Sequence, residues 1–227
     1  MTLLTVLILA LGIGANTAIF SVFKAVFLEP LPLPQSDELT FIWNRNIRRG
    51  GRGPSCFPDF RDWRAQNRTF EAMGAFGGVY LNLTEGDEPL RIRAAHATAS
   101  VFDVLGVQPA VGRTFIPEED LSGIPVVLLS HTLWTERFGT RPDLVGNTIQ
   151  VNGAPHTVIG IMPEGFQHPT PWGYSDPYQA WIPIRNDPWV QRRSSYSYQV
   201  IARLRDGVSV ATAQADLDQV SMRLEEE

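Results

Sequence analysis

The chain begins with an apolar run in which no charged side chain occurs from Met1 through Phe23. At a rise of about 1.5 Å per residue, about twenty residues of helix cover the roughly 30 Å of hydrocarbon in a bilayer. A helix can cross that layer alone because each backbone N–H and C=O finds its partner within the segment. The run therefore predicts a transmembrane helix over residues 2–28.

Two other interpretations of this run compete. A core helix of a soluble domain would show one continuous polar face. A cleaved signal peptide is favoured by the small residues at 12–15, but a charged n-region is missing and the apolar run continues beyond any plausible cleavage position. The polar residues of the run form no continuous face, which favours the membrane helix: Thr2, Thr5, Asn16, Thr17 and Ser21.

Composition narrows the class of protein. The formal net charge of −5 and the pI near 5.4 argue against a nucleic-acid partner, because phosphate contacts require a basic surface. Cys56 is the only cysteine, so the chain has neither a disulfide framework nor a thiolate metal cluster. Seventeen prolines and nineteen glycines indicate many turns between short strands rather than a helical bundle.

Residues 29–40 are predicted to form a proline-rich stalk. Prolines occupy alternate positions in residues 30–34, and proline fixes φ and removes a backbone donor. The first helix should therefore end here, and the chain should continue as an extended segment. The predicted domain, residues 41–227, follows, with a first strand expected at Leu39–Trp43. The polar residues 44–53 are expected to form a surface loop.

Helices are expected where capping residues precede apolar periodicity. The first should begin at Ser55 as its cap, with Pro58 in the first turn and Asp59 at the positive end of the helix dipole. Ser100–Leu105 should be a short helix whose first residue forms a capping pair with Asp103.

Two further helices are expected in the second half of the chain. His131–Phe138 should be a helix ended by Gly139. The last helix should begin at Ser209. Its apolar stripe would consist of Ala213, Leu217, Val220 and Leu224.

Two hairpins are expected. Val79–Thr84 and Leu90–Thr98 flank an acidic turn. Asn147–Val151 and Thr157–Met162 bracket Asn152-Gly153, a dipeptide that strongly favours a two-residue hairpin turn. Other strands are expected at Pro125–Leu129, Gln179–Ile184 and Tyr196–Leu204.

The sequence shows no constellation of residues for catalysis. The histidines have no partner at the i+3 or i+4 spacing of a zinc site: His96, His131, His156 and His168. Ser130 precedes His131, but adjacent residues on a helix point apart, so a nucleophile–base pair is not expected.

Cation and nucleotide sites are not indicated either. Glu118, Glu119 and Asp120 could attract a hard cation, although three consecutive carboxylates in a loop more often form a solvated turn. The sequence contains no GxxxxGK[ST] phosphate-binding loop. We therefore expect no catalytic, cofactor-binding or metal-binding residues, and no cofactor.

Taken in order, these segments resemble the periplasmic core domain of MacB-like ABC transporter permeases, which have an FtsX-like membrane region. The resemblance covers essentially the whole chain and is specific in order and spacing. It begins with residues 9–22 and 30–34, which are similar to the first transmembrane helix of that family and its exit. It continues through residues 58–63, 102–107, 112–115, 127–134, 138–139, 145–146, 151–153, 158–163 and 203–207.

The resemblance implies a permease subunit of an ABC transport system in a bacterial inner membrane, with its main domain on the periplasmic side. A separate ABC ATPase would bind ATP, and a permease dimer would transmit the motion to the extracytoplasmic domain for export or efflux. The implied partners are that ATPase, a second permease copy, other envelope components and membrane lipid.

Two departures from the family pattern lead to further expectations. The family has four transmembrane helices and a basic segment before the first, whereas this chain would hold one helix and no such segment. We therefore expect a chain that is truncated at its C-terminus and does not start naturally at Met1. Lys24 alone would weakly place the C-terminal side of the helix in the cytoplasm. The resemblance overrides this, because long domains translocate largely regardless of charge.

These patterns predict an α+β fold: a mixed, short-stranded extracytoplasmic domain of two interleaved subdomains behind one N-terminal transmembrane helix. The first subdomain would combine both ends of segment 41–227, and the second would be inserted between them. The expected function is not enzymatic. Two alternatives remain: a membrane-anchored extracytoplasmic hydrolase, which needs a convergent Ser/His/Asp or metal cluster, and a passive sensor or scaffold domain, which needs no ATPase.

Overall fold

The computed structural model describes residues 12–14, 16–17, 33–45, 51–84, 88–170 and 176–226. The chain divides into two compact units, Met1–Ser36 and Asp37–Glu227. A transmembrane helix was predicted over residues 2–28, and almost all of this range lies outside the described residues. The residues of the range that the structure describes, 12–14 and 16–17, are helical. Within the described ranges, no helix combines the length and the apolar character that crossing a bilayer requires.

The described part of the predicted stalk, residues 33–40, is not one extended segment. A turn leads into the 3-10 helix η2 (Ser36–Glu38), and strand β1 (Leu39–Ile42) follows directly. Gln35 in this turn has a φ of 48°. The prolines restrict only their own φ and that of the preceding residue, so the residues after Pro34 remain able to turn.

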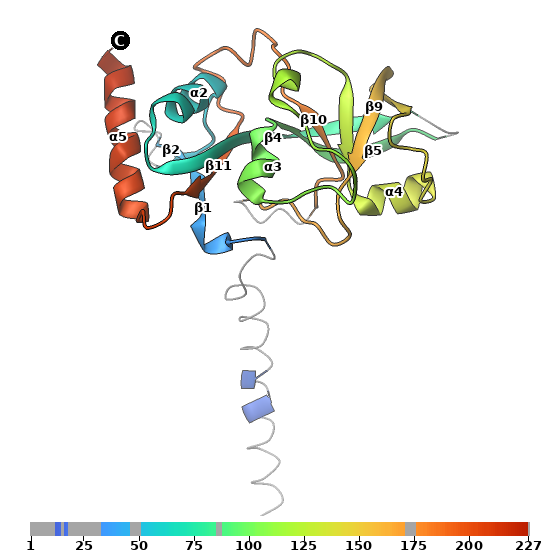
Figure 1. Cartoon of the computed structure of the whole chain (residues 1–227), viewed down its shortest axis with the longest axis horizontal. Helices are drawn as coiled ribbons and strands as arrows, with labels where there is room; N and C mark the ends of the chain where they lie inside the picture. The colour runs from blue at the N-terminus through green and yellow to red at the C-terminus, as the bar shows by residue number, and fades with distance from the viewer. Residues whose placement is uncertain are drawn as a thin grey trace, which may run out of the picture. The chain divides into compact units, whose positions relative to one another are not determined.

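The second unit is built on a nine-stranded mixed sheet (Figure 1). The sheet order is β1-β11-β4-β5-β10-β7-β9-β6, and β8 pairs with both β4 and β9. Besides β1, its strands are β4 (Phe70–Leu83), β5 (Leu90–Ala97), β6 (Val111–Gly112), β7 (Val126–Leu129), β8 (Thr148–Val151), β9 (Ala154–Ile161), β10 (Ala180–Pro183) and β11 (Gln199–Leu204).

Six of these strands pair in a closed ring, in the order β4, β5, β10, β7, β9, β8 and back to β4. The contact that closes the ring is short, because β8 meets β4 only where Leu83 lies opposite Val151. Strands β11 and β1 continue the sheet outside the ring from the first half of β4. β4 is therefore the one strand of the sheet that belongs both to the ring and to this extension.

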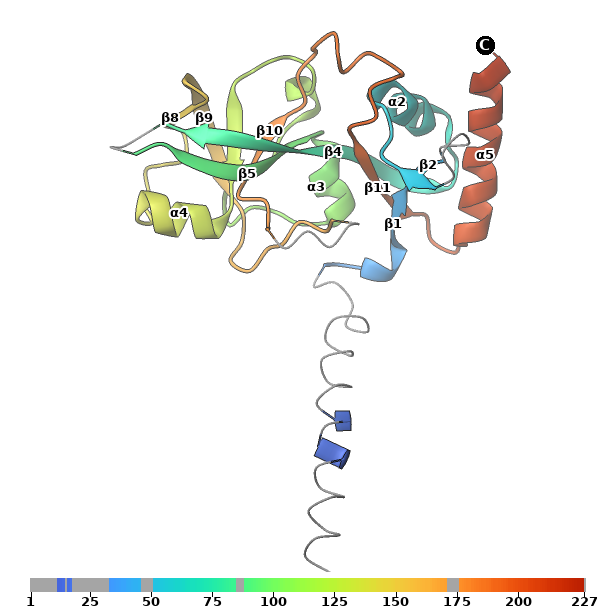
Figure 2. The same cartoon turned by 180° about the vertical axis from the view of Figure 1, so that it is seen from behind.

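Helices cover the two ends of the sheet (Figures 1 and 2). Helices α2 and α5 lie near the end with β11, and α4 lies near the ring. Trp63 Nε1 donates to Ser221 Oγ at 3.3 Å and so links α2 to α5. The helix bounds are α2 (Phe57–Gln66), α3 (Ser100–Leu105), the 3-10 helix η3 (Pro117–Glu119), α4 (His131–Phe138) and α5 (Val210–Glu226).

Two clusters of buried apolar side chains lie one on each half of β4, and further buried side chains, such as Phe102 and Trp181, belong to neither. The first cluster lies under α2 and α5 and includes Phe60, Met73, Val200, Leu217 and Val220. The second cluster lies inside the ring and includes Leu81, Ile92, Leu129, Ile149 and Val158. The first cluster draws on both ends of segment 41–227, and the second draws on its middle.

Elements with strong local signals form as the sequence predicts. Helices α3 and α4 have the predicted bounds, and each ends at a glycine in the left-handed region, Gly106 and Gly139. The hairpin of β8 and β9 turns at Asn152 and Gly153, with φ of 51° and 76°. The buried stripe of the last helix is also confirmed.

Both predicted N-terminal caps were wrong. Ser55 pairs with Tyr198 through two backbone hydrogen bonds, and the cap of α2 is Cys56, whose Sγ accepts from Asp59 N at 3.4 Å. The cap of α3 is Ala99 rather than Ser100. In both cases the backbone at the helix start is held by residues distant in sequence, which local patterns do not reveal.

The predicted surface loop at residues 44–53 is partly a hairpin. Asn44–Arg45 (β2) and Arg52–Gly53 (β3) form a two-stranded antiparallel ladder, and residues 46–50 lie outside the described residues. Polar composition does not exclude strand pairing at a surface, since exposed ladders need no apolar face.

Candidate functional site

The histidines do not form a site. His168 is buried among aromatic rings, with its ring centroid 4.3 Å from that of Phe76, and burial lowers the pKa of His168 to about 4. Burial also lowers the pKa of His96. Among the residues that the structure describes, no group of three His, Cys, Asp or Glu side chains could hold a metal ion.

Ser130 and Cys56, the residues considered as nucleophiles, have structural roles. Ser130 Oγ accepts from Leu133 N at 3.1 Å and caps α4. Cys56 is fully buried, and burial raises the pKa of its thiol to about 12. A thiol of this kind stays protonated at physiological pH and is not a nucleophile.

The acidic run at residues 118–120 is only partly solvated, because Glu118 is exposed, Glu119 is buried and Asp120 is half-buried. Glu119 is buried and forms an ion pair with Arg113 at 2.6 Å. Burial opposes its charge, but Arg113 and the N–H of Ile116 outweigh burial and hold the pKa of Glu119 below its ordinary value. Asp120 Oδ1 accepts from Ala99 N at 2.9 Å. Both carboxylates therefore already have donors from the protein.

A buried arginine fastens the start of the second unit to its sheet. Arg203 on β11 is 6% exposed, and its Nη1 lies 3.3 Å from Glu38 Oε2, at the end of η2. Its Nε and Nη2 donate to Val104 O at 3.2 and 2.7 Å. That carbonyl lies in the last turn of α3, where a helix leaves carbonyls without an intrahelical partner. We call Glu38, Val104 and Arg203 the neck junction.

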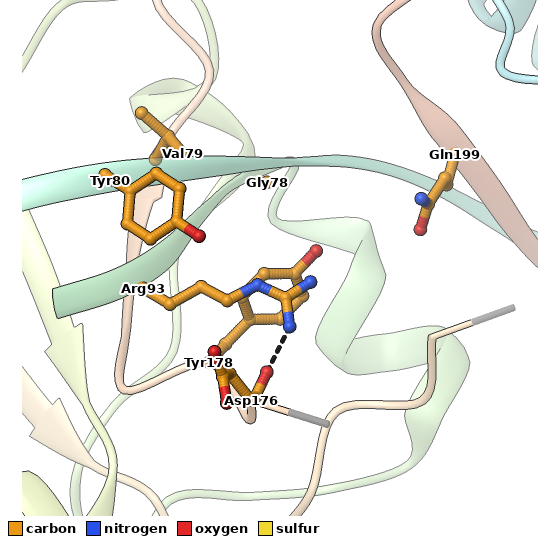
Figure 3. A pocket seen from close by; sticks show the side chains of 7 residues that line it. All are labelled: Gly78, Val79, Tyr80, Arg93, Asp176, Tyr178 and Gln199. Atoms are coloured by element: carbon orange, nitrogen blue, oxygen red, sulfur yellow. Dashed lines mark hydrogen bonds between the residues drawn. The ribbon is translucent and has the colours of Figure 1, made fainter. Parts of the chain in front are cut away.

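A pocket of about 290 Å³ lies beside the middle of β4 (Figure 3). Tyr80 on β4 lies opposite Arg93 on β5, and Gly78 lies opposite Ala95. Since side chains alternate between the faces of a strand, Gly78 and Tyr80 share one face. The pocket is lined by Gly78, Val79, Tyr80, Arg93, Asp176, Tyr178 and Gln199.

The arginine of this pocket has a defined position. The Arg93 guanidinium lies over the Tyr178 ring, 4.6 Å from its centroid, and donates to the backbone carbonyl of Asp176. The Tyr178 ring is buried and packs against His168 at 5.4 Å. A Cβ on Gly78 would lie 3.2 Å from the Tyr178 hydroxyl. The Tyr178 ring can therefore occupy this position because Gly78 has no side chain.

The opposite wall of the pocket is a carboxamide. Gln199, the first residue of β11, points toward Arg93 across the pocket (Figure 3). Its Oε1 is buried without a hydrogen-bond partner among the described residues. A buried acceptor without a donor costs about 1–3 kcal/mol. The pocket is thus lined by one guanidinium, one carboxamide, one carboxylate and two phenols, which suits binding by hydrogen bonds.

Neither this pocket nor the neck junction was predicted from the sequence. Both depend on strands that are distant in sequence, with more than a hundred residues between Arg93 and Gln199. The one local signal was Gly77-Gly78 within an otherwise strand-like segment, since glycine inside a strand often marks close approach of another group.

The fold matches solved domains of membrane transport proteins. The periplasmic region of MacB from Actinobacillus actinomycetemcomitans has a TM-score of 0.63 and 16% identity, over 84% of this chain and 85% of that chain. The extracellular domain of the noncanonic ABC-type transporter YknZ from Gram-positive bacteria has a TM-score of 0.60 and 14% identity, over 82% and 93%. At these identities the likeness establishes the fold alone.

The sequence makes the assignment more specific. The chain belongs to the family of MacB-like periplasmic core domains, whose model matches residues 2–220. It is 26% identical over 137 residues to the macrolide export ATP-binding/permease proteins MacB of Salmonella paratyphi A and Salmonella typhi. These matches cover 60% of this chain, which spans about a fifth (21%) of the length of those relatives.

Proposed function

We propose that this chain is part of a permease subunit of an ABC transport system, and that its domain transmits ATP-driven motion for export or efflux. The observation that carries the proposal is the family match over residues 2–220. The MacB relatives named above are described as macrolide export ATP-binding/permease proteins. We infer from them the class of machine but not the transported substrate.

The proposal includes partners and a location. A separate ABC ATPase would supply the energy. A second permease copy, and other envelope components, would complete the assembly. Residues 2–28 would span the inner membrane in contact with lipid, with residues 41–227 on the periplasmic side.

The neck junction is the proposed point of entry of the motion. A displacement of residues 29–38 would act on Glu38 and, through Arg203, on β11 and α3. We further propose that the two apolar clusters are the cores of two interleaved subdomains. Because β4 contributes side chains to both cores, it would carry the displacement from the first subdomain to the second.

The test measures motion of the domain directly in the full permease assembled with its ATPase in proteoliposomes. Met222 on α5 is 57% exposed, so a spin label at Met222→Cys would report the distance between the two copies. The native Cys56 is fully buried and would not react. We expect the distance distribution to change when ATP is added and to be unchanged with an ATPase that cannot bind ATP. A distribution that ATP does not alter would contradict motion transmission.

A further inference from the structure

The backbone of β4 presents its hydrogen-bonding groups alternately to its two edges. Ala75 faces the β5 edge, because its N–H donates to Thr98 Oγ1 at 3.0 Å and its carbonyl accepts from Thr98 N at 2.9 Å. Asn82 faces the opposite edge, where it exchanges hydrogen bonds with Asn152 at 2.8 Å. Since the period of a strand is two, Gly78 and Tyr80 face the same edge as Asn82.

That edge is open between two neighbouring strands. β11 covers it as far as the pair of Phe76 with Gln199, and β8 meets it again where Leu83 lies opposite Val151. Within the described part of the chain, no strand pairs with Gly78 or Tyr80 on this side. Both residues are exposed. The N–H and C=O groups of Gly78 and Tyr80 thus form an unpaired edge, a template for pairing with another chain.

The side chains beside this open edge favour an acidic ligand. Arg91 and Arg93 alternate along β5, and the Arg91 guanidinium lies over the Tyr80 ring at 4.4 Å. Among the described residues that line the pocket, Asp176 supplies the one carboxylate. Gln199 Oε1, buried and without a partner among the described residues, stands where the edge begins and can accept an N–H from an added strand.

We propose that the open edge of β4 at Gly78–Tyr80 binds an extended, acidic segment of a partner polypeptide by β-strand addition. The added strand would exchange hydrogen bonds with Gly78 and Tyr80, and one of its N–H groups would reach Gln199. An acidic side chain would enter the pocket beside Arg93. Main-chain pairing supplies affinity in this mode of recognition, and the pocket supplies specificity. The proposal goes beyond the transport function and does not depend on it.

The binding test uses the full chain in detergent and a fluorescein-labelled peptide of sequence TEVEVT. We expect saturable binding, measured by fluorescence anisotropy. Two control peptides isolate the interactions: TKVKVT reverses the charge, and a TEVEVT peptide with N-methylated alternate amides cannot donate to one edge. Each control should bind at least about tenfold more weakly, because each loses hydrogen bonds or charge complementarity. Equal binding of either control would overturn the proposal, as would no saturation below 1 mM.

A matched pair of variants locates the binding site. Tyr80→Pro removes the N–H that faces the open edge, and Tyr80→Ala deletes the ring but keeps that N–H. We expect Tyr80→Pro to weaken binding about tenfold more than Tyr80→Ala does. Arg91→Gln should weaken binding several-fold and reduce its salt dependence, and this exposed variant tests the proposal if Tyr80→Pro does not fold. If these variants change self-association and leave peptide binding unaltered, a second copy occupies the edge and the proposal is wrong.

Discussion

Buried charges in this domain are held by backbone groups as much as by opposite charges. Arg203 donates twice to one helix carbonyl in addition to its ion pair with Glu38. Asp120 accepts the N–H of Ala99, and Glu119 accepts the N–H of Ile116. The bonds of Arg203 and Asp120 each fix one end of α3 to a residue distant in sequence. Substitutions at these positions should therefore alter stability more than substitutions at exposed ion pairs.

Arg203→Met tests the neck junction. The change removes the donor of Glu38 and of the Val104 carbonyl, and it should lower the free energy of unfolding by about 2 kcal/mol. Urea denaturation of the full chain in detergent measures the effect. The matched control is Arg141→Met, which removes an exposed pair with Asp143 at 3.3 Å and should change stability little. Equal effects of the two substitutions would refute the structural role of the junction.

Asp120 should make the stability of the domain depend on pH. Burial raises the pKa of Asp120 from 3.8 to about 6, so the folded state favours the protonated carboxyl. This contribution to stability is fully present below pH 3.8 and is lost as the pH rises through about 6. Asp120→Asn stays neutral and can still accept the N–H of Ala99.

We therefore expect Asp120→Asn to be more stable than the wild type at pH 7.5 and to lose this advantage by pH 4. Chemical denaturation of both proteins at a series of pH values gives the difference. The difference in stability between the two proteins removes the contribution of the groups that titrate in both. A difference that is constant with pH would show that burial does not raise the pKa of Asp120.

At the scale of elements, β4 organises the second unit. Its first half pairs with β11 and its second half belongs to the ring, so one strand joins both apolar clusters. Gly74 permits this arrangement because it lets α3 pack closely against β4, and not because glycine has a freer backbone. A Cβ on Gly74 would lie 2.6 Å from Val101 Cα, so α3 rests directly on the strand.

Gly74→Ala should destabilise the domain by about 1–3 kcal/mol, because the added methyl meets backbone that can move only with α3. The matched control is Gly53→Ala on β3, where a Cβ would meet nothing within 4 Å. Thermal unfolding followed by near-ultraviolet circular dichroism compares the two. If Gly74→Ala unfolds at the same temperature as Gly53→Ala, the close approach of α3 has no energetic importance.

The same elements show how far the sequence predicts the fold. Strands and helices with a local signal, such as the Asn152-Gly153 hairpin and α4, have the predicted place. β4 was predicted only from Val79, yet it begins at Phe70. Its first half is rich in glycine and alanine, and pairing with β11 overrides this weak strand propensity.

The candidate site was beyond local prediction for a related reason. An open edge exists only because β11 begins at Gln199 and β8 meets β4 at Leu83, and neither register can be read from one segment. The predicted hairpin of Val79–Thr84 with Leu90–Thr98 is confirmed and places Arg91 and Arg93 beside β4, but nothing in the sequence showed which strands would meet the other edge of β4.

At the scale of the whole molecule, the second unit holds its own core. Both apolar clusters lie within Asp37–Glu227, and the neck junction also lies within these bounds. The uncharged run from Met1 to Phe23 precedes the second unit in the sequence. Solubility and folding of the second unit should therefore not require that run.

A fragment of residues 37–227 should be soluble, folded, and monomeric or weakly self-associating. The fragment of residues 39–227 differs only by the loss of Asp37 and Glu38, so it should fold but unfold at a lower urea concentration, because Arg203 loses its carboxylate. Light scattering after size-exclusion chromatography and urea denaturation measure the two properties. Aggregation of both fragments would mean that the apolar run covers part of the domain. Equal stability of the two would mean instead that Glu38 does not stabilise the neck junction. The motion would then have to enter the domain at another residue, such as one on β1.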